Sequence, residues 1–406
     1  MGYKIKISNL IFFLISLCVM YECKWFNIIG LTGIWVKYIR IAICLGLFIF
    51  CKSSHRANRK ICKQARFMNK FILILVVIIL FEMQHTMRIQ EVSAVVVIEY
   101  IINNFVCFLL VYPLLYLFQE NSFEKICNWL STICFGSIVI QLFVAIIYNL
   151  SGEILLPQLI RSEGWSRNDM IRISSTCLSW FVIIYCISKL LDKTRLKKQN
   201  TVIICTLTLM YVFLVNQSRA QYTAIIAAIV LMVLFNKASS TRQIIIGFCT
   251  LVVAVFFIQS GILDSLINKI SSLSTNDTIG FRLYKMDFIS KLIQQYPVGG
   301  MGFIHTNDIL ASQRIYFADF GLIGDYLHYG VFSLYIYIVT IIRIISTLRI
   351  IAQNKGKGES LLRGILWYLV FGIIGFTCID GGRIFSLPCI WAIEEHIRYN
   401  ALRSNR

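Results

Sequence analysis

Long apolar runs recur from one end of this 406-residue sequence to the other, and they restrict its fold more than any other feature. A helix of about 20 apolar residues crosses a bilayer, and on that basis we predict about twelve spans. They lie near residues 7–21, 29–51, 69–85, 92–118, 129–150, 173–190, 201–216, 220–236, 243–262, 321–348, 361–379 and 384–397. Hydrophobic residues make up 58% of the chain and charged residues only 15%. The sequence therefore predicts an all-α integral membrane protein, a polytopic helical bundle, and excludes a soluble enzyme with one anchor.

The net charge of +19 is concentrated in short segments between the predicted spans. Lysine and arginine are dense in residues 52–70, 189–198 and 343–363, and such loops remain in the cytoplasm. The numbers of spans between these segments are even, so both termini are predicted to be cytoplasmic as well. We predict one membrane domain over residues 1–406 with two larger outer segments, about 151–172 and 263–320, which fold as short helices. Most of the positive charge thus sets topology, and no nucleic-acid partner is expected.

Cysteine and histidine show no pattern that is typical of a metal site. The 14 cysteines include no CxxC pair, and the five histidines are scattered along the chain. Zinc sites need closely spaced Cys or His ligands, so no metal and no cofactor is predicted. Cysteines in membrane spans usually serve as small apolar residues.

The cations assigned to the outer face include more arginines than lysines. The arginines are Arg88, Arg161, Arg167, Arg172, Arg219, Arg282, Arg314 and Arg383. A guanidinium group binds phosphate oxygens in pairs and stays ionised, which favours a phosphate or pyrophosphate ligand over simple contact with lipid headgroups. Arg219 stands out because it lies in a short polar turn where the next helix begins, near Ala220, and a helix N-terminus attracts anions. The alternative is an arginine that reaches the headgroups.

Two further clusters contain residues of types that bind ligands or take part in catalysis. The first follows Arg282 and contains the sequence Tyr-Pro-Val-Gly-Gly-Met-Gly-Phe at residues 296–303, where the glycines favour a turn over a phosphate-binding loop. The second runs from Asp319 to Gly330 and includes a second aspartate and His328. Ionisable residues at the mouth of a membrane domain are functional candidates. Asp319 is also suited to cap a helix. The second aspartate, Asp325, lies three residues before His328, so the two side chains share a helix face and can pair.

Taken together, these motifs resemble those of the Wzy-type polysaccharide polymerases, and the related O-antigen ligases share the same plan. The resemblance rests on the Ser-Arg turn at Arg219, the Arg282 segment leading into residues 296–303, and the Asp-x-Gly sequence that leads to Gly330. It extends to the arrangement of the whole chain.

The resemblance implies glycosyl transfer at the outer face of a bacterial inner membrane. Donor and acceptor would be oligosaccharide repeat units linked to undecaprenyl pyrophosphate, and no nucleotide sugar or metal would take part. The product would be O-antigen, capsule or exopolysaccharide, with a chain-length-regulating membrane protein as a partner. Arg219 and Arg282 would bind the pyrophosphate, joined by the remaining site arginines, which are Arg161, Arg167, Arg172 and Arg314. Asp319 would be the general base, with His305 and His328 as alternatives.

This sequence departs from the pattern of the ligases. When the motif before the last large span is aligned on Gly330, Asp319 stands where ligases have histidine and His328 where they have glutamate. Arginine followed eleven residues later by glycine, a pattern of some polymerases, is not found at Arg161 or Arg172, which are followed at that spacing by Arg172 and Ile183. The differences favour a polymerase, and a ligase, a flippase for the same lipid-linked unit and a noncatalytic assembly subunit remain as alternatives.

Overall fold

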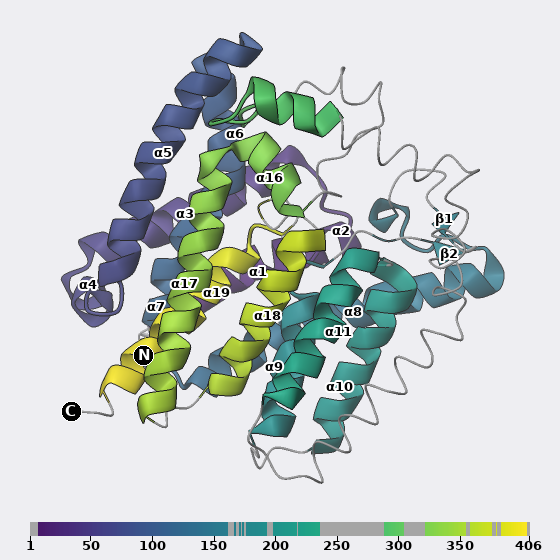
Figure 1. Ribbon diagram of the computed structural model, residues 1–406. Coiled ribbons are helices and arrows are strands. Elements are labelled where there is room, and N and C mark those ends of the chain that lie inside the picture. Colours follow the sequence, from purple (N-terminus) through teal and green to yellow (C-terminus); the bar gives the residue numbers. More distant parts are fainter. Residues whose placement is uncertain are drawn as a thin grey trace, which may run out of the picture.

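The computed structural model is a bundle of apolar helices (Figure 1). It describes residues 7–160, 166–167, 170–171, 173, 176–192, 198–216, 218–235, 288–303, 321–354, 358–375, 379 and 383–403. The first half contains α1 (Ile7–Glu22), α2 (Trp25–Ile28), α3 (Ile34–Ser53), α4 (His55–Ile61), α5 (Arg66–Gln90), α6 (Ala94–Phe105), η1 (Val106–Leu110), α7 (Val111–Glu120), α8 (Phe123–Ser151) and η2 (Pro157–Leu159). The second half contains β1 (Ser166–Arg167), β2 (Met170–Ile171), α9 (Ser179–Leu191), α10 (Lys198–Tyr211), η3 (Val212–Asn216), α11 (Arg219–Leu234), α16 (Gly321–Tyr329), α17 (Val331–Asn354), α18 (Glu359–Gly375) and α19 (Ser386–Arg403).

Six helices in the described ranges are long and apolar enough to cross a membrane. Their bounds are Ile34–Ser53, Arg66–Gln90, Ala94–Glu120, Phe123–Ser151, Gln199–Asn216 and Val331–Gln353. Shorter apolar helices cover Ile7–Glu22, Ser179–Leu191 and Ala220–Leu234. The all-α membrane fold is confirmed, while the count of about twelve spans stays a prediction, because the span near 243–262 lies outside the described residues.

The span predicted over residues 321–348 is not one continuous helix in the structure. The chain forms α16 and α17, separated by Gly330, which has a φ of +54°. At this break the Val331 N–H donates to the Val298 carbonyl over 2.9 Å, so another segment of the chain replaces the helical hydrogen bond. A β-carbon on Gly330 would lie 2.3 Å from the same carbonyl oxygen, which explains why glycine occupies the position.

The outer segment 151–172 also differs from the short helices that were predicted. It contains the single turn η2 and an antiparallel hairpin in which Ser166 pairs with Ile171 and Arg167 with Met170. A bridge between Ile160 and Ile173 extends the pairing. In the segment 263–320, helical residues 288–295 agree with the prediction, and the rest of its helical pattern, which includes Phe281, lies outside the described residues.

The basic segments gather at one end of the bundle, which we call the basic end and define by the start of α5 and the ends of α9, α17 and α19. There Ser360 at the start of α18 donates to Asp192 after α9, over 2.5 Å, and Arg398 of α19 donates to Thr347 of α17, over 3.1 Å. Figure 1 shows residues 288–295 beside the end of α5 and the start of α6 at the top of the view, with the ends of α17 and α19 at the lower left. The start of α5 thus lies at the same end of the bundle as the ends of α9, α17 and α19, and the cytoplasmic orientation of the termini stays a prediction.

Candidate functional site

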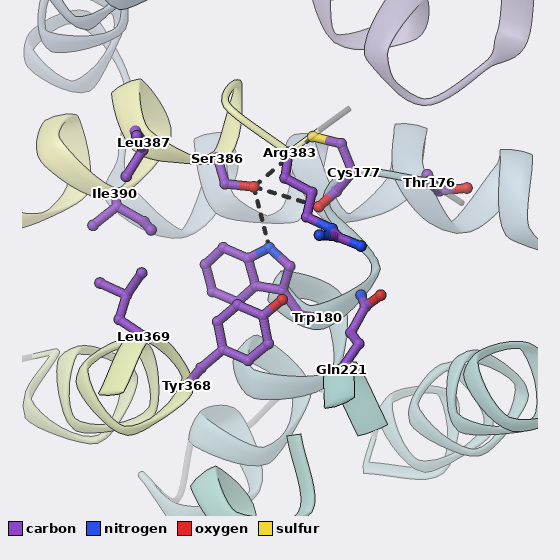
Figure 2. A pocket seen from close by; sticks show the side chains of 10 residues that line it. All are labelled: Thr176, Cys177, Trp180, Gln221, Tyr368, Leu369, Arg383, Ser386, Leu387 and Ile390. Atoms are coloured by element: carbon purple, nitrogen blue, oxygen red, sulfur yellow. Dashed lines mark hydrogen bonds between the residues drawn. The ribbon is translucent and has the colours of Figure 1, made fainter. Parts of the chain in front are cut away.

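A pocket lies at the end of the bundle opposite the basic end, between α9, α11, α18 and α19 (Figure 2). Its lining comes from the first turns of α9, α11 and α19, the outer half of α18 and the residues that precede α9 and α19. We call it the arginine pocket, and its lining residues are Thr176, Cys177, Trp180, Gln221, Tyr368, Leu369, Arg383, Ser386, Leu387 and Ile390.

Two stacked aromatic rings form a rigid wall of the arginine pocket. The rings of Trp180 and Tyr368 lie 4.4 Å apart with an interplanar angle of 8°. The indole N–H of Trp180 donates to the Ser386 hydroxyl over 3.2 Å, and that hydroxyl contacts the Cys177 carbonyl at 3.4 Å. Since both rings are almost fully buried, their role is to fix the spacing of α9, α18 and α19 around the pocket.

Arg383 is the one charged residue among those that line the pocket. It precedes α19, and its carbonyl accepts from the Ser386 N–H over 2.9 Å, which ties it to the first turn of that helix. In Figure 2 the guanidinium group extends into the space between Thr176 and the amide of Gln221. A half-buried guanidinium in a pocket lining can donate several hydrogen bonds to an anionic ligand.

Buried amides and hydroxyls hold the helices behind the pocket. Gln221 accepts from the Asn216 amide over 2.6 Å and donates to Ser179 over 3.2 Å, so it joins η3, α11 and α9. Polar groups in an apolar bundle are costly unless they are hydrogen-bonded, so this pairing fixes the turn between η3 and α11. That turn carries Arg219.

A second set of hydrogen bonds continues the network toward α8. The Tyr211 hydroxyl donates to Gln141 over 2.9 Å and lies 3.2 Å from the hydroxyl of Thr176, and Gln141 donates to Thr176 over 3.1 Å. The network links three stretches that are distant in the sequence, at residue 141, at 176–179 and at 211–221. It therefore positions the pocket more specifically than apolar packing alone.

Arg219 opens α11, within one residue of the predicted helix start near Ala220. The preceding residue, Ser218, has extended backbone and makes no side-chain cap. The Arg219 backbone thus lies two residues from Gln221 in the pocket wall, while its side chain is outside the described part of the structure. The positive end of the helix dipole adds to the preference of this region for anions.

The glycine-rich sequence forms a tight turn over the end of α5 and over α16, as predicted. We call residues 297–303 the glycine clasp. His85 Nε2 lies 3.1 Å from the Gly300 carbonyl, and the Phe303 N–H donates to Thr86 over 3.0 Å. Gly300 has a φ of +60°, and a β-carbon there would lie 2.4 Å from the Leu327 carbonyl oxygen. The glycines thus permit close backbone packing, which makes a phosphate-binding role unnecessary to explain them.

His328 is buried beneath the glycine clasp. Its Nε2 lies 3.1 Å from the Phe303 carbonyl oxygen and 3.5 Å from the Tyr100 hydroxyl. A carbonyl only accepts, so Nε2 carries the hydrogen when it bonds to Phe303, and it cannot then act as a base. One turn earlier, the Asp325 carboxylate accepts a hydrogen bond from Tyr337. Both side chains therefore fix the junction of α16 with its neighbours.

Most of the other predicted site residues lie outside the described part of the chain. These are Asp319, His305, Arg282, Arg161, Arg172 and Arg314, and Arg167 is described only as backbone in β1. Gly321, two residues after Asp319, packs on α18, where a β-carbon would lie 2.2 Å from the Ile373 carbonyl oxygen. The chain thus enters α16 beside the same helix that supplies Tyr368 to the arginine pocket.

In the sequence, Arg383 is only one of several cations assigned to the outer face, and nothing there distinguishes the two residues of the aromatic wall. The sequence does contain a signal for Arg383, because Asp-Gly-Gly-Arg at residues 380–383 is a short polar stretch between two apolar runs, like the stretch around Arg219. Trp180 and Tyr368 gave no such signal, since aromatic residues are common in membrane spans. Across the described residues, no group of three His, Cys, Asp or Glu could hold a metal ion.

In a comparison with models of protein families, one model matches part of this sequence. Residues 204–337 match the family model described as O-antigen ligase, from within α10 to the first turns of α17. The matched region includes Arg219, Arg282, Asp319 and His328, the residues on which the predicted resemblance partly rests. No curated protein matches the sequence. The resemblance is confirmed for this region, and it supports a multi-pass bacterial membrane protein with a function of the O-antigen ligase or polymerase type.

Proposed function

We propose that this chain, similar to the O-antigen ligase family over residues 204–337, is a membrane glycosyltransferase that polymerises lipid-linked oligosaccharide repeat units. Donor and acceptor are carried on undecaprenyl pyrophosphate at the outer face of the bacterial inner membrane. The product is an O-antigen, a capsule or an exopolysaccharide, and a chain-length-regulating membrane protein is the expected partner.

The observation that carries the proposal is the arginine pocket at the end opposite the basic end. There the half-buried Arg383 lines the same pocket as Gln221, which lies in the first turn of α11, the helix that begins with Arg219. A cationic pocket near a membrane surface suits a lipid pyrophosphate, because the charged group stays at the headgroup level while the lipid chain remains in the bilayer.

In the proposed reaction, the main contribution of the protein to catalysis is positive charge beside the leaving group. A sugar hydroxyl of the acceptor attacks the anomeric carbon of the donor, the bond from that carbon to the pyrophosphate oxygen breaks, and the leaving pyrophosphate gains negative charge. Preorganised guanidinium groups stabilise that charge in the transition state more than in the ground state. Arg383 joins Arg219 and Arg282 in this role.

The hydroxyl proton passes to a general base. Asp319 is our first assignment, since it precedes Gly321, which packs on the helix that lines the pocket. His305 is the first alternative. His328 is the weaker alternative, because its Nε2 lies against the Phe303 carbonyl under the glycine clasp. Either carboxylate or imidazole would serve at neutral pH.

The proposal is tested in a strain deleted for this gene, with the polysaccharide resolved by gel electrophoresis. We expect Arg219→Ala and Arg383→Ala each to leave single exported repeat units in place of long chains, at unchanged protein level. Arg88→Ala is the matched control, because Arg88 is an exposed arginine at the same end of the bundle and outside the pocket.

The same experiment separates the alternatives. Full-length polymer from both the Arg219 and the Arg383 variants at normal protein level would contradict the assigned roles and would favour a noncatalytic subunit. Chains that are formed but not transferred to the final acceptor would indicate a ligase. Repeat units retained on the cytoplasmic side would indicate a flippase.

A further inference from the structure

A second pocket lies at the basic end, between the segment that leads into α5 and the helices α17 and α19. Five cations line it, together with one carboxylate: Lys63, Arg66, Lys70, Arg343, Arg398 and Glu395. We call it the basic pocket. Topology alone requires cations in this loop, but it does not require them to converge on one cavity with cations from two other helices.

The charge of the basic pocket is not balanced within its lining. The carboxylate of Glu395 accepts from Arg343 over 2.5 Å, so these two groups neutralise each other. Lys63, Arg66 and Lys70 recur at helical spacing and are exposed, and none forms an ion pair with a described carboxylate. Three positive charges on one side of a pocket attract an anion.

Gln64 provides a second, independent sign of a missing ligand. Its side chain lines the same pocket and is only 2% exposed, and neither its amide nitrogen nor its amide oxygen has a hydrogen-bond partner among the described residues. Leaving a buried polar group unsatisfied is costly, and the native state normally supplies a partner. The amide needs a partner that both accepts and donates hydrogen bonds, which a phosphodiester without a neighbouring hydroxyl does not provide.

The remaining wall of the basic pocket is apolar. Phe67, Tyr399 and Leu402 line it, and Phe67 is held under the Arg343 guanidinium at 4.0 Å. Leu402 is 48% exposed at the rim, close to where α5 enters the predicted span. Cations beside exposed apolar side chains at this level suit the headgroup and upper acyl chains of a lipid better than a soluble anion.

We propose that the basic pocket binds the headgroup of an anionic phospholipid that carries a free hydroxyl, such as phosphatidylglycerol or cardiolipin. The phosphodiester oxygens lie against Lys63, Arg66 and Lys70 and accept from the Gln64 amide, and the headgroup hydroxyl donates to the Gln64 amide oxygen. This inference is independent of the function proposed above, because it concerns the other end of the bundle.

The test measures lipid retention by the full-length protein in native mass spectrometry, from nanodiscs of phosphatidylcholine mixed with phosphatidylglycerol. We expect the triple variant Lys63→Gln, Arg66→Gln, Lys70→Gln to lose phosphatidylglycerol, by roughly fivefold in affinity for each cation removed. Arg59→Gln and Arg349→Gln are matched controls, since both arginines are exposed and neither lines the pocket. Equal loss in the controls, or no loss in the triple variant, would overturn the proposal.

Gln64→Leu tests the assignment with little risk to folding, because it removes an unsatisfied amide. This variant should lose its preference for phosphatidylglycerol over dioleoyl phosphatidylmethanol, a phosphodiester of the same charge that lacks the headgroup hydroxyl. An unchanged preference would overturn the role of the hydroxyl. Inorganic phosphate at millimolar concentration should leave the bound lipid in place, and its displacement would identify a soluble anion as the ligand instead.

Discussion

Replacing either partner of the buried ion pair between α1 and α3 should destabilise the protein strongly, and replacing both should not. Arg40 interrupts the second predicted span, and the structure pairs it with Glu22, with exposed fractions of 7% and 3%. The guanidinium group also donates to the Asn103 carbonyl and lies 4.8 Å from the centre of the Tyr21 ring. The pair therefore joins α1, α3 and α6 inside the bundle.

The expected magnitude follows from this burial. Removing one partner of a buried pair leaves an uncompensated charge and costs about 3–5 kcal/mol, whereas replacing both by uncharged groups is often neutral. Arg40→Met and Glu22→Gln should each lower the free energy of unfolding by that amount. The double variant should lose less than either single variant, although the Asn103 carbonyl then lacks its donor, at a cost of about 1–3 kcal/mol.

The assay is denaturant unfolding in detergent micelles, followed by circular dichroism, with Lys37→Met on the same helix as a control that changes stability little. If the two single effects simply add in the double variant, the pair is not the stabilising unit that the structure indicates. The double variant should also still make polymer. A stable double variant that fails to export repeat units would instead support a transport role for Arg40.

Two further predictions concern the clasp and the topology. Gly300→Ala should lower the stability of the protein by at least about 1–2 kcal/mol, because Gly300 has a positive φ and its added β-carbon would lie against the Leu327 carbonyl. Gly46→Ala is the control, because a β-carbon there meets no atom within 4 Å. Equal melting temperatures for the two variants would contradict the close packing of the glycine clasp. A membrane-impermeant maleimide should label the exposed Cys62 only in permeabilised cells and Glu153→Cys in intact spheroplasts. The reverse pattern would invert the topology.

The sequence was sufficient for the positions of the long helices. The spans predicted at 69–85 and 129–150 correspond to α5 and α8, because the bilayer sets the length of an apolar run and leaves little freedom for its position. It could not predict the break between α16 and α17. Both sides of Gly330 are apolar and glycine is common in membrane helices, so only the contact with Val298 distinguishes a break from a continuous helix.

The arginine pocket was less predictable than the helices. Its wall combines Trp180 with Tyr368, which are far apart in the sequence and resemble ordinary membrane aromatics when taken singly. The arginines were easier to predict as functional residues. Placing an ionised side chain beside a membrane costs free energy, so such a residue is a candidate for a functional role. The sequence therefore identified the charges near the site, and the packing of α9, α11, α18 and α19 was needed to join Arg383 to Gln221.

The central claim, that this chain alone transfers glycan at the arginine pocket, is tested most directly with purified protein in liposomes that contain undecaprenyl-pyrophosphate-linked repeat units. We expect a ladder of lipid-linked chains together with released undecaprenyl pyrophosphate, without added nucleotide sugar or metal. Arg383→Ala should reduce the initial rate by about 10²–10³-fold, as for other lost donors to a developing anion, and Arg88→Ala should leave it unchanged. A rate for the Arg383→Ala variant equal to that of the unmodified protein would contradict the claim.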